Sequence, residues 1–172
     1  MHFSINPVRS TEDLEATKCL FKAYAEHLNI DLTFQDFGNE MNSMPGKYAP
    51  PNGELLLARD ASGVPLGCVA VRPLASQSCC EMKRLFISPT GRGKGLGKEL
   101  VKAVVETASG LGYTEMRLDT IPSMVQAISI YEKAGFVPIK AYYNTPLEGT
   151  IFLSRKLVST DAAPAAPLDG SS

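Results

Sequence analysis

The stretch TGRGKGLGKEL, residues 90–100, contains four glycines and three basic residues in eleven positions. Glycine at this density carries an entropic cost and contributes no side-chain packing, so we expect a loop whose bare backbone is used. The apolar strand-like run CCEMKRLFIS, residues 79–88, precedes it. A helical stripe follows it at Leu96, Leu100, Ala103, Val104, Ala108 and Leu111. A loop between a strand and a helix N-terminus presents unpaired amides and the positive end of the helix dipole, which favours binding of an anion such as pyrophosphate.

Two common phosphate-binding patterns do not fit this loop. The dinucleotide pattern G-x-G-x-x-G requires a third glycine where the chain has Leu96 or, one register on, Lys98. The P-loop pattern requires a glycine at Arg92. What remains is Arg92-x-x-Gly95-x-Gly97. A solvated turn with incidental basic residues is the alternative interpretation.

Periodicity along the chain predicts a mixed α/β fold with the element order β-α-α-β-β-β-α-β-α-β-β. Ser10 is expected to cap the first helix, which fades near residues 27–29, and Ser123 is expected to cap the last helix, which ends at Gly135. We expect one domain over residues 1–158. Residues 159–172 are small, polar and proline-bearing, which predicts a disordered tail.

The composition excludes several functional classes. With 44% apolar residues and a net charge of −1 from 17 basic and 18 acidic residues, the chain is globular and is not a nonspecific nucleic-acid binder. No apolar run reaches the length of a membrane span, and the first ten residues do not resemble a signal peptide, so we expect a cytoplasmic protein. Four cysteines without a C-x-x-C pair and two histidines predict buried reduced thiols and no metal site.

The glycine loop and a second segment, AISIYEKAGF at residues 127–136, together resemble the GNAT superfamily of acyl-CoA-dependent N-acyltransferases. RGKGLG fits the family signature [QR]-x-x-G-x-[GA], and the second segment fits the later alanine, tyrosine and glycine-phenylalanine pattern. The resemblance covers roughly Leu55 to Leu157. It implies a GNAT-like, largely antiparallel central sheet flanked by helices.

The resemblance also implies acetyl-CoA as the cofactor. Its pyrophosphate would lie on Arg92, Gly93, Lys94, Gly95, Leu96, Gly97 and Lys98. The preceding strand would carry a bulge whose free backbone pairs with the pantetheine arm, at Leu85, Phe86 and Ile87. The Leu85 amide would polarise the thioester carbonyl. One departure is Met124, which stands where many members have an asparagine.

Two residues match catalytic positions of the family. Tyr131 matches the general acid, and a phenol with a pKa near ~10 stays protonated at neutral pH. A core tyrosine is the alternative. Glu81 matches the general base of one branch of the family, and the alternative is a solvent-facing glutamate or a salt bridge to Lys83 or Arg72.

The acceptor side is less defined by the sequence. Family resemblance assigns to it Tyr24, Tyr48, Arg72, Tyr142, Tyr143 and Asn144. Aromatic rings and an arginine suit a small amine or an amino-acid-like carboxylate, although AYYNTP also fits a turn packed for stability. We therefore expect an N-acetyltransferase, monomeric or homodimeric, that moves acetyl directly from acetyl-CoA to a primary amine of a small molecule. The alternatives are a noncatalytic acyl-CoA-binding module and a protein N-acetyltransferase.

Overall fold

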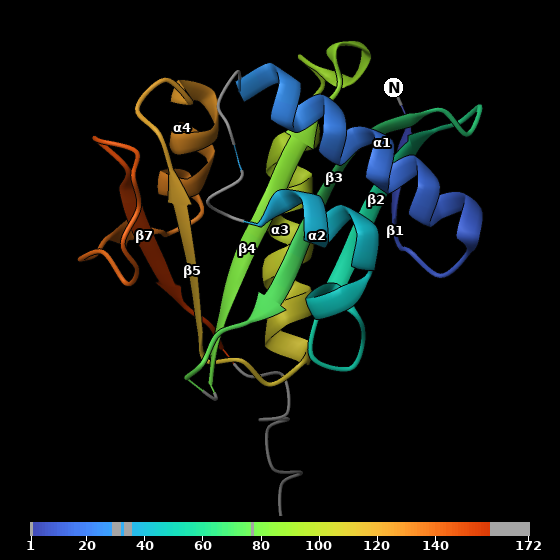
Figure 1. Ribbon diagram of the computed structural model, residues 1–172. Helices are drawn as coiled ribbons and strands as arrows, with labels where there is room; N and C mark the ends of the chain where they lie inside the picture. Colours follow the sequence, from blue (N-terminus) through green and yellow to red (C-terminus); the bar gives the residue numbers. More distant parts are fainter. Residues whose placement is uncertain (1, 29–31, 33–35, 77, 159–172) are drawn as a thin grey trace, which may run out of the picture.

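The computed structural model describes residues 2–28, 32, 36–76 and 78–158. The predicted disordered tail, residues 159–172, lies outside them, and the single domain over residues 1–158 stays a prediction. The predicted order of elements is confirmed (Figure 1). The elements are β1 (Phe3–Pro7), α1 (Thr11–Leu28), α2 (Phe37–Ser43), the 3-10 turn η2 (Gly46–Tyr48), β2 (Glu54–Asp60), β3 (Pro65–Pro73), β4 (Cys79–Ile87), the 3-10 turn η3 (Pro89–Gly91), α3 (Leu96–Gly110), β5 (Glu115–Thr120), α4 (Val125–Lys133), β6 (Val137–Pro138) and β7 (Ile151–Lys156).

The strands form one seven-stranded sheet in the order β1-β2-β3-β4-β5-β7-β6. Every pairing is antiparallel except the parallel pair β4–β5. That pair is short, because only Cys79–Glu81 and Glu115–Arg117 lie in register. Beyond these residues the two strands separate, which opens the sheet in its middle (Figure 1).

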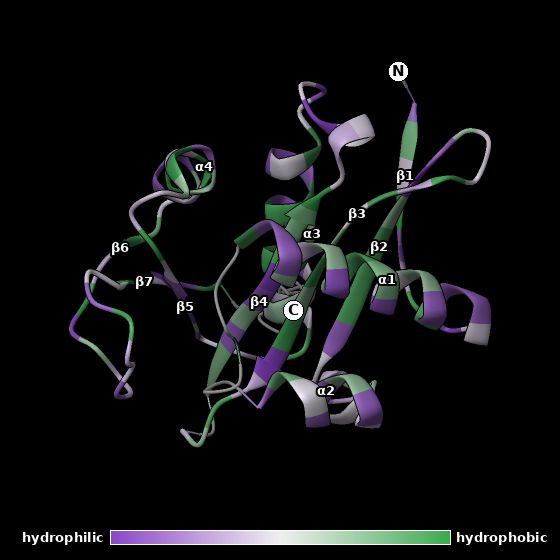
Figure 2. Cartoon of the chain, turned by 45° about the horizontal axis from the view of Figure 1, so that its top comes forward, coloured by the Kyte–Doolittle hydropathy of each residue, from purple (hydrophilic) through white to green (hydrophobic). Residues whose placement is uncertain are grey.

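Helices cover both faces of the sheet. On one face Phe21 of α1 and Tyr48 of η2 pack with the apolar side chains of β2 and β3, and Phe37 and Met41 of α2 pack against the same cluster. On the other face α3 packs with Leu100 and Val104 against Met116. Figure 1 shows α1 and α2 in front of the sheet and α3 behind it, and Figure 2 shows hydrophobic strands between helices with hydrophilic outer faces. The largely antiparallel sheet flanked by helices is therefore confirmed.

The start of α1 follows the sequence closely. The Asp13 amide donates to the Ser10 Oγ at 3.0 Å, so Ser10 is the predicted cap. The Asp13 carboxylate has another partner than the backbone of Ser10. It instead pairs with Arg59 of β2 at 2.7 Å, which ties the helix to the sheet.

Two expectations were wrong. Ser123 does not cap α4: the N-cap is Met124, whose side chain makes no capping hydrogen bond, because the helix begins one residue later than predicted. Gly135, with a φ of 93°, does follow its end. Of the four reduced cysteines three are buried, but Cys19 is exposed, since it lies on the outer side of α1.

Candidate functional site

The site is built around an irregularity in β4. The register pairs Cys68 with Phe86 and Ala70 with Lys83, so the single residue Val69 lies opposite two residues, Arg84 and Leu85. This is a β-bulge, and Arg84 adopts a φ of 60°, which non-glycine residues rarely do. The bulge expected from the sequence is therefore present. On the other side of β4 the ladder with β5 has already ended, so the bulge faces the opening in the sheet.

The glycine loop exposes its backbone. Gly93 and Gly95 have φ values of 78° and 75°, and a Cβ added at either would meet no atom within 4 Å. Gly95 is the N-cap of α3, so the first amides of that helix lie beside the open loop. The Arg92 Nε donates to the Ile87 carbonyl at 3.2 Å, which fixes the loop to the end of β4. An anion can approach this backbone closely.

At Gly97, glycine is required by helix packing and not by an open backbone. It is buried, and a Cβ there would lie 2.8 Å from Cδ1 of Ile130 on α4. This glycine therefore lets α3 and α4 approach each other. Its neighbour Leu96 is only 1% exposed and points into the core, so it offers a ligand its backbone alone.

A cavity of about 500 Å³, the loop hollow, lies between the end of β4, the glycine loop and the start of α4. Six predicted cofactor residues line it: Leu85, Phe86, Ile87, Arg92, Gly93 and Gly97. Gly95 and Lys98 instead line a neighbouring groove between α3 and α4. Lys94 is exposed, and its Nζ donates to the Thr90 carbonyl at 2.7 Å. The structure thus brings most of the predicted cofactor residues to one hollow.

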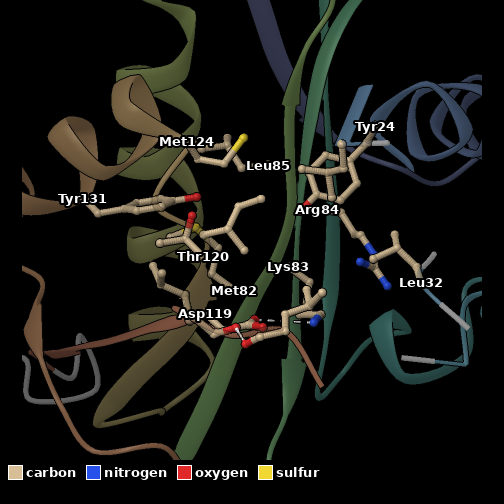
Figure 3. A pocket seen from close by; sticks show the side chains of 15 residues that line it. Tyr24, Leu32, Met82, Lys83, Arg84, Leu85, Asp119, Thr120, Met124 and Tyr131 are labelled. Atoms are coloured by element: carbon tan, nitrogen blue, oxygen red, sulfur yellow. Dashed lines mark hydrogen bonds and ion pairs between the residues drawn. The ribbon is translucent and has the colours of Figure 1, made fainter. Parts of the chain in front are cut away.

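A smaller cavity of about 50 Å³, the central gap, lies where β4 and β5 separate (Figure 3). It shares Leu85 and Met124 with the loop hollow. Tyr131 of α4 and Asp119 of β5 line it, and Figure 3 shows the Tyr131 hydroxyl directed into it. The central gap therefore connects the loop hollow with a tyrosine hydroxyl.

Tyr131 fits the requirements of a proton donor. The side chain is 7% exposed, and burial, followed by electrostatic interactions with Tyr24 and Asp119, raises its pKa. Within the described part of the chain, the Tyr131 hydroxyl has no hydrogen-bond partner. The hydroxyl is thus protonated at neutral pH and available to a ligand. Its ring also packs edge-on against Phe136, as the alternative of a core tyrosine requires.

On the far side of the central gap lies a cavity of about 460 Å³, the tyrosine hollow. Four residues predicted for the acceptor line it: Tyr48, Arg72, Tyr142 and Tyr143. It shares Lys83 with the central gap. Of the other predicted residues, Tyr24 lines the central gap, whereas Asn144 is exposed and lines none of the three cavities. The loop hollow and the tyrosine hollow thus each share lining residues with the central gap.

Comparison with known proteins decides the family. The sequence model of the Acetyltransferase (GNAT) family matches residues 16–136. The chain belongs to this family. It is 40% identical to an uncharacterized N-acetyltransferase of Schizosaccharomyces pombe, over 88% of this chain and 93% of that one. It is 31% identical to an uncharacterized N-acetyltransferase of Dictyostelium discoideum, over 87% of this chain and 97% of that one.

A solved structure shows the same fold. A GNAT-family acetyltransferase from Staphylococcus aureus superposes with a TM-score of 0.75 at 20% identity, over 91% of this chain and 99% of that one. The GNAT resemblance stated from the two sequence segments is therefore confirmed, and so is the assignment of an acyltransferase enzyme.

Glu81 lies deep in the wall of the tyrosine hollow of this GNAT chain and is 1% exposed. Its Oε1 accepts from the Arg72 Nε at 2.9 Å and lies 3.9 Å from the Lys83 Nζ. Its Oε2 accepts from the Tyr142 hydroxyl at 2.5 Å. The salt bridges weighed as the alternative to a catalytic base are both present. Oε2 accepts a single hydrogen bond from the described residues, so it is the oxygen of Glu81 with acceptor capacity left.

Sequence reasoning missed a second carboxylate, Asp119, which lies in the central gap itself. Its Oδ1 is 3.7 Å from the Lys83 Nζ, and its Oδ2 accepts from the Tyr143 hydroxyl. Burial lowers the pKa of Lys83, although both carboxylates oppose this shift. The available signal was a run of charges at residues 81, 83 and 84 in an otherwise apolar strand, because charges survive inside a sheet only where they meet partners.

The bulge is also tied to α2. The Arg84 guanidinium, 2% exposed, pairs with Glu40 through Nε–Oε2 at 3.0 Å and NH2–Oε1 at 3.2 Å. It lies over the rings of Phe37 and Tyr24 at 5.2 and 5.8 Å. Since Glu40 lines the tyrosine hollow, one buried ion pair joins its wall to the bulge beside Leu85.

No metal site is expected from these side chains. Among residues 2–28, 32, 36–76 and 78–158, no group of three or more His, Cys, Asp or Glu side chains is placed to hold an ion. In the same residues no helix combines the length and the apolar character that crossing a membrane requires.

Proposed function

We propose that this GNAT chain is an acetyl-CoA-dependent N-acetyltransferase that transfers acetyl directly to a primary amine of a small molecule. One observation carries the proposal: the loop hollow and the tyrosine hollow each share lining residues with a central gap into which the Tyr131 hydroxyl points. A donor bound on one side and an acceptor bound on the other would react between them, without an acyl-enzyme.

The residues of the loop hollow fit the cofactor. The open space over Gly93 and Gly95 and the amides at the start of α3 suit a pyrophosphate, with Arg92, Lys94 and Lys98 adding positive charge. Acetyl-CoA, when bound, supplies the acetyl group as an activated thioester. The backbone of Leu85, Phe86 and Ile87 lies along the hollow that would hold the pantetheine arm. The Leu85 amide, in the bulge, is the proposed hydrogen-bond donor to the thioester carbonyl.

Tyr131 is the proposed acid. Its hydroxyl carries a proton at neutral pH and would deliver it to the departing thiolate. Glu81 is the proposed base that receives the proton of the acceptor amine, directly or through water. Its Oε2, which accepts from Tyr142, has a second lone pair for the amine or the water.

The pH–rate profile of Glu81→Gln tests this role. If Glu81 is the base, the variant loses the acidic limb of the profile and partly recovers at high pH, where the amine is already neutral. A variant that keeps the wild-type limb and changes only KM assigns Glu81 to holding Arg72 instead.

The size of the tyrosine hollow favours a small acceptor over a protein. At about 460 Å³ it lies within the usual range for small-molecule sites, roughly 300–1,000 Å³. The unbonded Tyr131 hydroxyl in the gap favours catalysis over a noncatalytic acyl-CoA-binding module, which has no need of a proton donor there.

The deciding experiment measures coenzyme A release from acetyl-CoA by the purified protein with a panel of amines. We expect turnover with at least one small amine and its loss in Tyr131→Phe. Binding of coenzyme A without turnover on any amine would support the noncatalytic alternative. Turnover restricted to peptides and proteins would support protein acetylation.

A further inference from the structure

In the tyrosine hollow, the carboxylate acceptors and the N–H donors differ in how far the protein's own groups already bond them. Its buried carboxylates already have partners on both oxygens. In Glu40, Oε1 accepts from the Tyr48 hydroxyl at 2.7 Å and Oε2 from Arg84 at 3.0 Å. Glu81 is held by Arg72 and Tyr142. A cationic group of a ligand would therefore find no buried carboxylate in this hollow without a partner.

The same is true of Asp119, where the hollow joins the central gap, because its oxygens face Lys83 and the Tyr143 hydroxyl. At the rim, Asp36 is exposed and its Oδ1 accepts from the Asn39 amide at 2.9 Å. The buried negative charges of the site are thus committed to the protein's own donors, and Asp36, at the exposed rim, is held at one oxygen.

Arg72 differs from these groups. Both of its contacts, from Nε and from NH2, go to one oxygen of Glu81 at 2.9 Å. A guanidinium has five N–H donors, so most of them remain. Within the described residues, no other acceptor for Arg72 is found. Its side chain is 26% exposed, whereas that of Glu81 is 2% exposed, so the remaining donors face the hollow.

From this surplus of donors we infer that the acceptor is an amino carboxylate, whose carboxylate binds Arg72 and whose amine reaches the central gap past Lys83. This inference rests on the proposed function and names its acceptor class. Arginine presents a planar pair of N–H groups that matches a carboxylate in two parallel hydrogen bonds. Lys47, exposed on the rim, adds a second positive charge for the same group. Glu81 fixes the orientation of the guanidinium from behind.

The test compares matched acceptors on the wild-type protein. Amino acids are each measured beside the corresponding decarboxylated amine and carboxamide, by coenzyme A release and, without acetyl-CoA, by calorimetric binding. We expect kcat/KM and affinity for the acids to exceed those for both analogues by about 100-fold, because the analogues would cover the donors of Arg72 in the hollow without pairing them. Equal or better use of the decarboxylated amines would overturn the inference.

Two arginine variants locate the effect. Arg72→Lys keeps a charge for Glu81 but loses the planar pair of donors, so the preference for acid over amine should fall to within about threefold. Arg59→Lys is the matched control: Arg59 is 23% exposed, pairs with Asp13 at 2.7 Å and lies outside the three cavities, so the preference should persist. A preference that persists in folded Arg72→Lys contradicts the assignment of Arg72.

The two proposals fail separately. Absence of coenzyme A release with every amine, acidic or not, would refute the proposed function, while calorimetry would still decide whether acids bind in preference to amines. If Arg72→Lys does not fold, as a thermal melt would show, the matched acceptors on the wild-type protein decide alone.

Discussion

The strands β4 and β5 have one end where they are paired and one end where they are apart, and the two ends use similar residues differently. At the paired end, Glu115 accepts from Arg117 and from the Ser154 hydroxyl, which joins β5 to β7. At the open end, Lys83 and Asp119 form a similar ion pair, but they line a cavity. Where the ladder is complete, charges contribute to stability. Where the ladder stops, a similar ion pair borders a cavity next to the bulge in β4.

The largest effect is expected at the open end, from Tyr131→Phe. The change removes one hydroxyl and keeps the ring against Phe136, so the fold should persist. Turnover should fall by roughly 10²–10⁴, the usual range for loss of a general acid, with little change in affinity for acetyl-CoA. Steady-state kinetics in a regime limited by chemistry measure this.

Tyr113 offers a matched control, because it is also 7% exposed and its hydroxyl donates to the Asn52 carbonyl at 2.6 Å, away from the three cavities. Tyr113→Phe should lower stability by about 1 kcal/mol and leave turnover unchanged. Wild-type turnover in Tyr131→Phe would assign Tyr131 to the core alone.

A smaller effect is expected from cofactor binding to the wild-type chain. A ligand that binds only the native state adds about 2.7 kcal/mol to the free energy of unfolding at a hundredfold excess over its Kd. The melting temperature should therefore rise with acetyl-CoA or coenzyme A and not with NAD. A rise with ATP and none with coenzyme A would indicate a nucleotide site instead.

Variants of the glycine loop can distinguish the effect of backbone strain from the effect of blocking the ligand. Gly95→Val places a β-branched residue at a φ of 75°, which costs of order 1–3 kcal/mol, and fills the open space over the loop. Affinity for acetyl-CoA, measured by calorimetry, should fall by about tenfold or more.

Gly63→Val is the control for that strain. Gly63 has a φ of 85° with no atom near an added Cβ, but it lies in the turn between β2 and β3. Gly63→Val should lower the melting temperature about as much as Gly95→Val does, and it should leave the affinity for acetyl-CoA unchanged. An equal loss of affinity in both variants would mean that the loop acts only through stability.

These contrasts show which parts of the site sequence alone could predict. The glycine loop and Tyr131 are each set by short local patterns, so their elements and placement were predicted. The bulge required the family resemblance, since nothing local marks Arg84 as a residue with positive φ.

The salt bridges of Glu81 to Arg72 and Lys83 were weighed from the sequence as an alternative, but the rest of the charge network was beyond such prediction. Glu40, Arg72, Lys83 and Asp119 come from four elements, and their pairing depends on where β4 and β5 part. The start of α4 was missed because its N-cap, Met124, makes no capping hydrogen bond with its side chain, so the sequence contains no capping residue that marks it.

The smallest effect is expected at the paired end, from Glu115→Gln. The hydrogen bond from Arg117, followed by that from Ser154, lowers the pKa of Glu115 below its ordinary value of 4.5. A carboxyl group with a lowered folded-state pKa contributes stability that is fully present above its ordinary value and is lost as the pH falls through the folded-state value. Since the side chain is 31% exposed, the contribution should be only about 0.5–1 kcal/mol.

Urea unfolding of wild type and Glu115→Gln from pH 7 down to pH 3 tests this. The difference in unfolding free energy should hold from pH 7 to about pH 5 and shrink below it, while turnover at pH 7 stays at the wild-type level. Glu132→Gln, an exposed change on α4, should show no such pH-dependent difference. A loss of turnover in Glu115→Gln would refute the division itself, because the paired end of the two strands would then act on the reaction as the open end does.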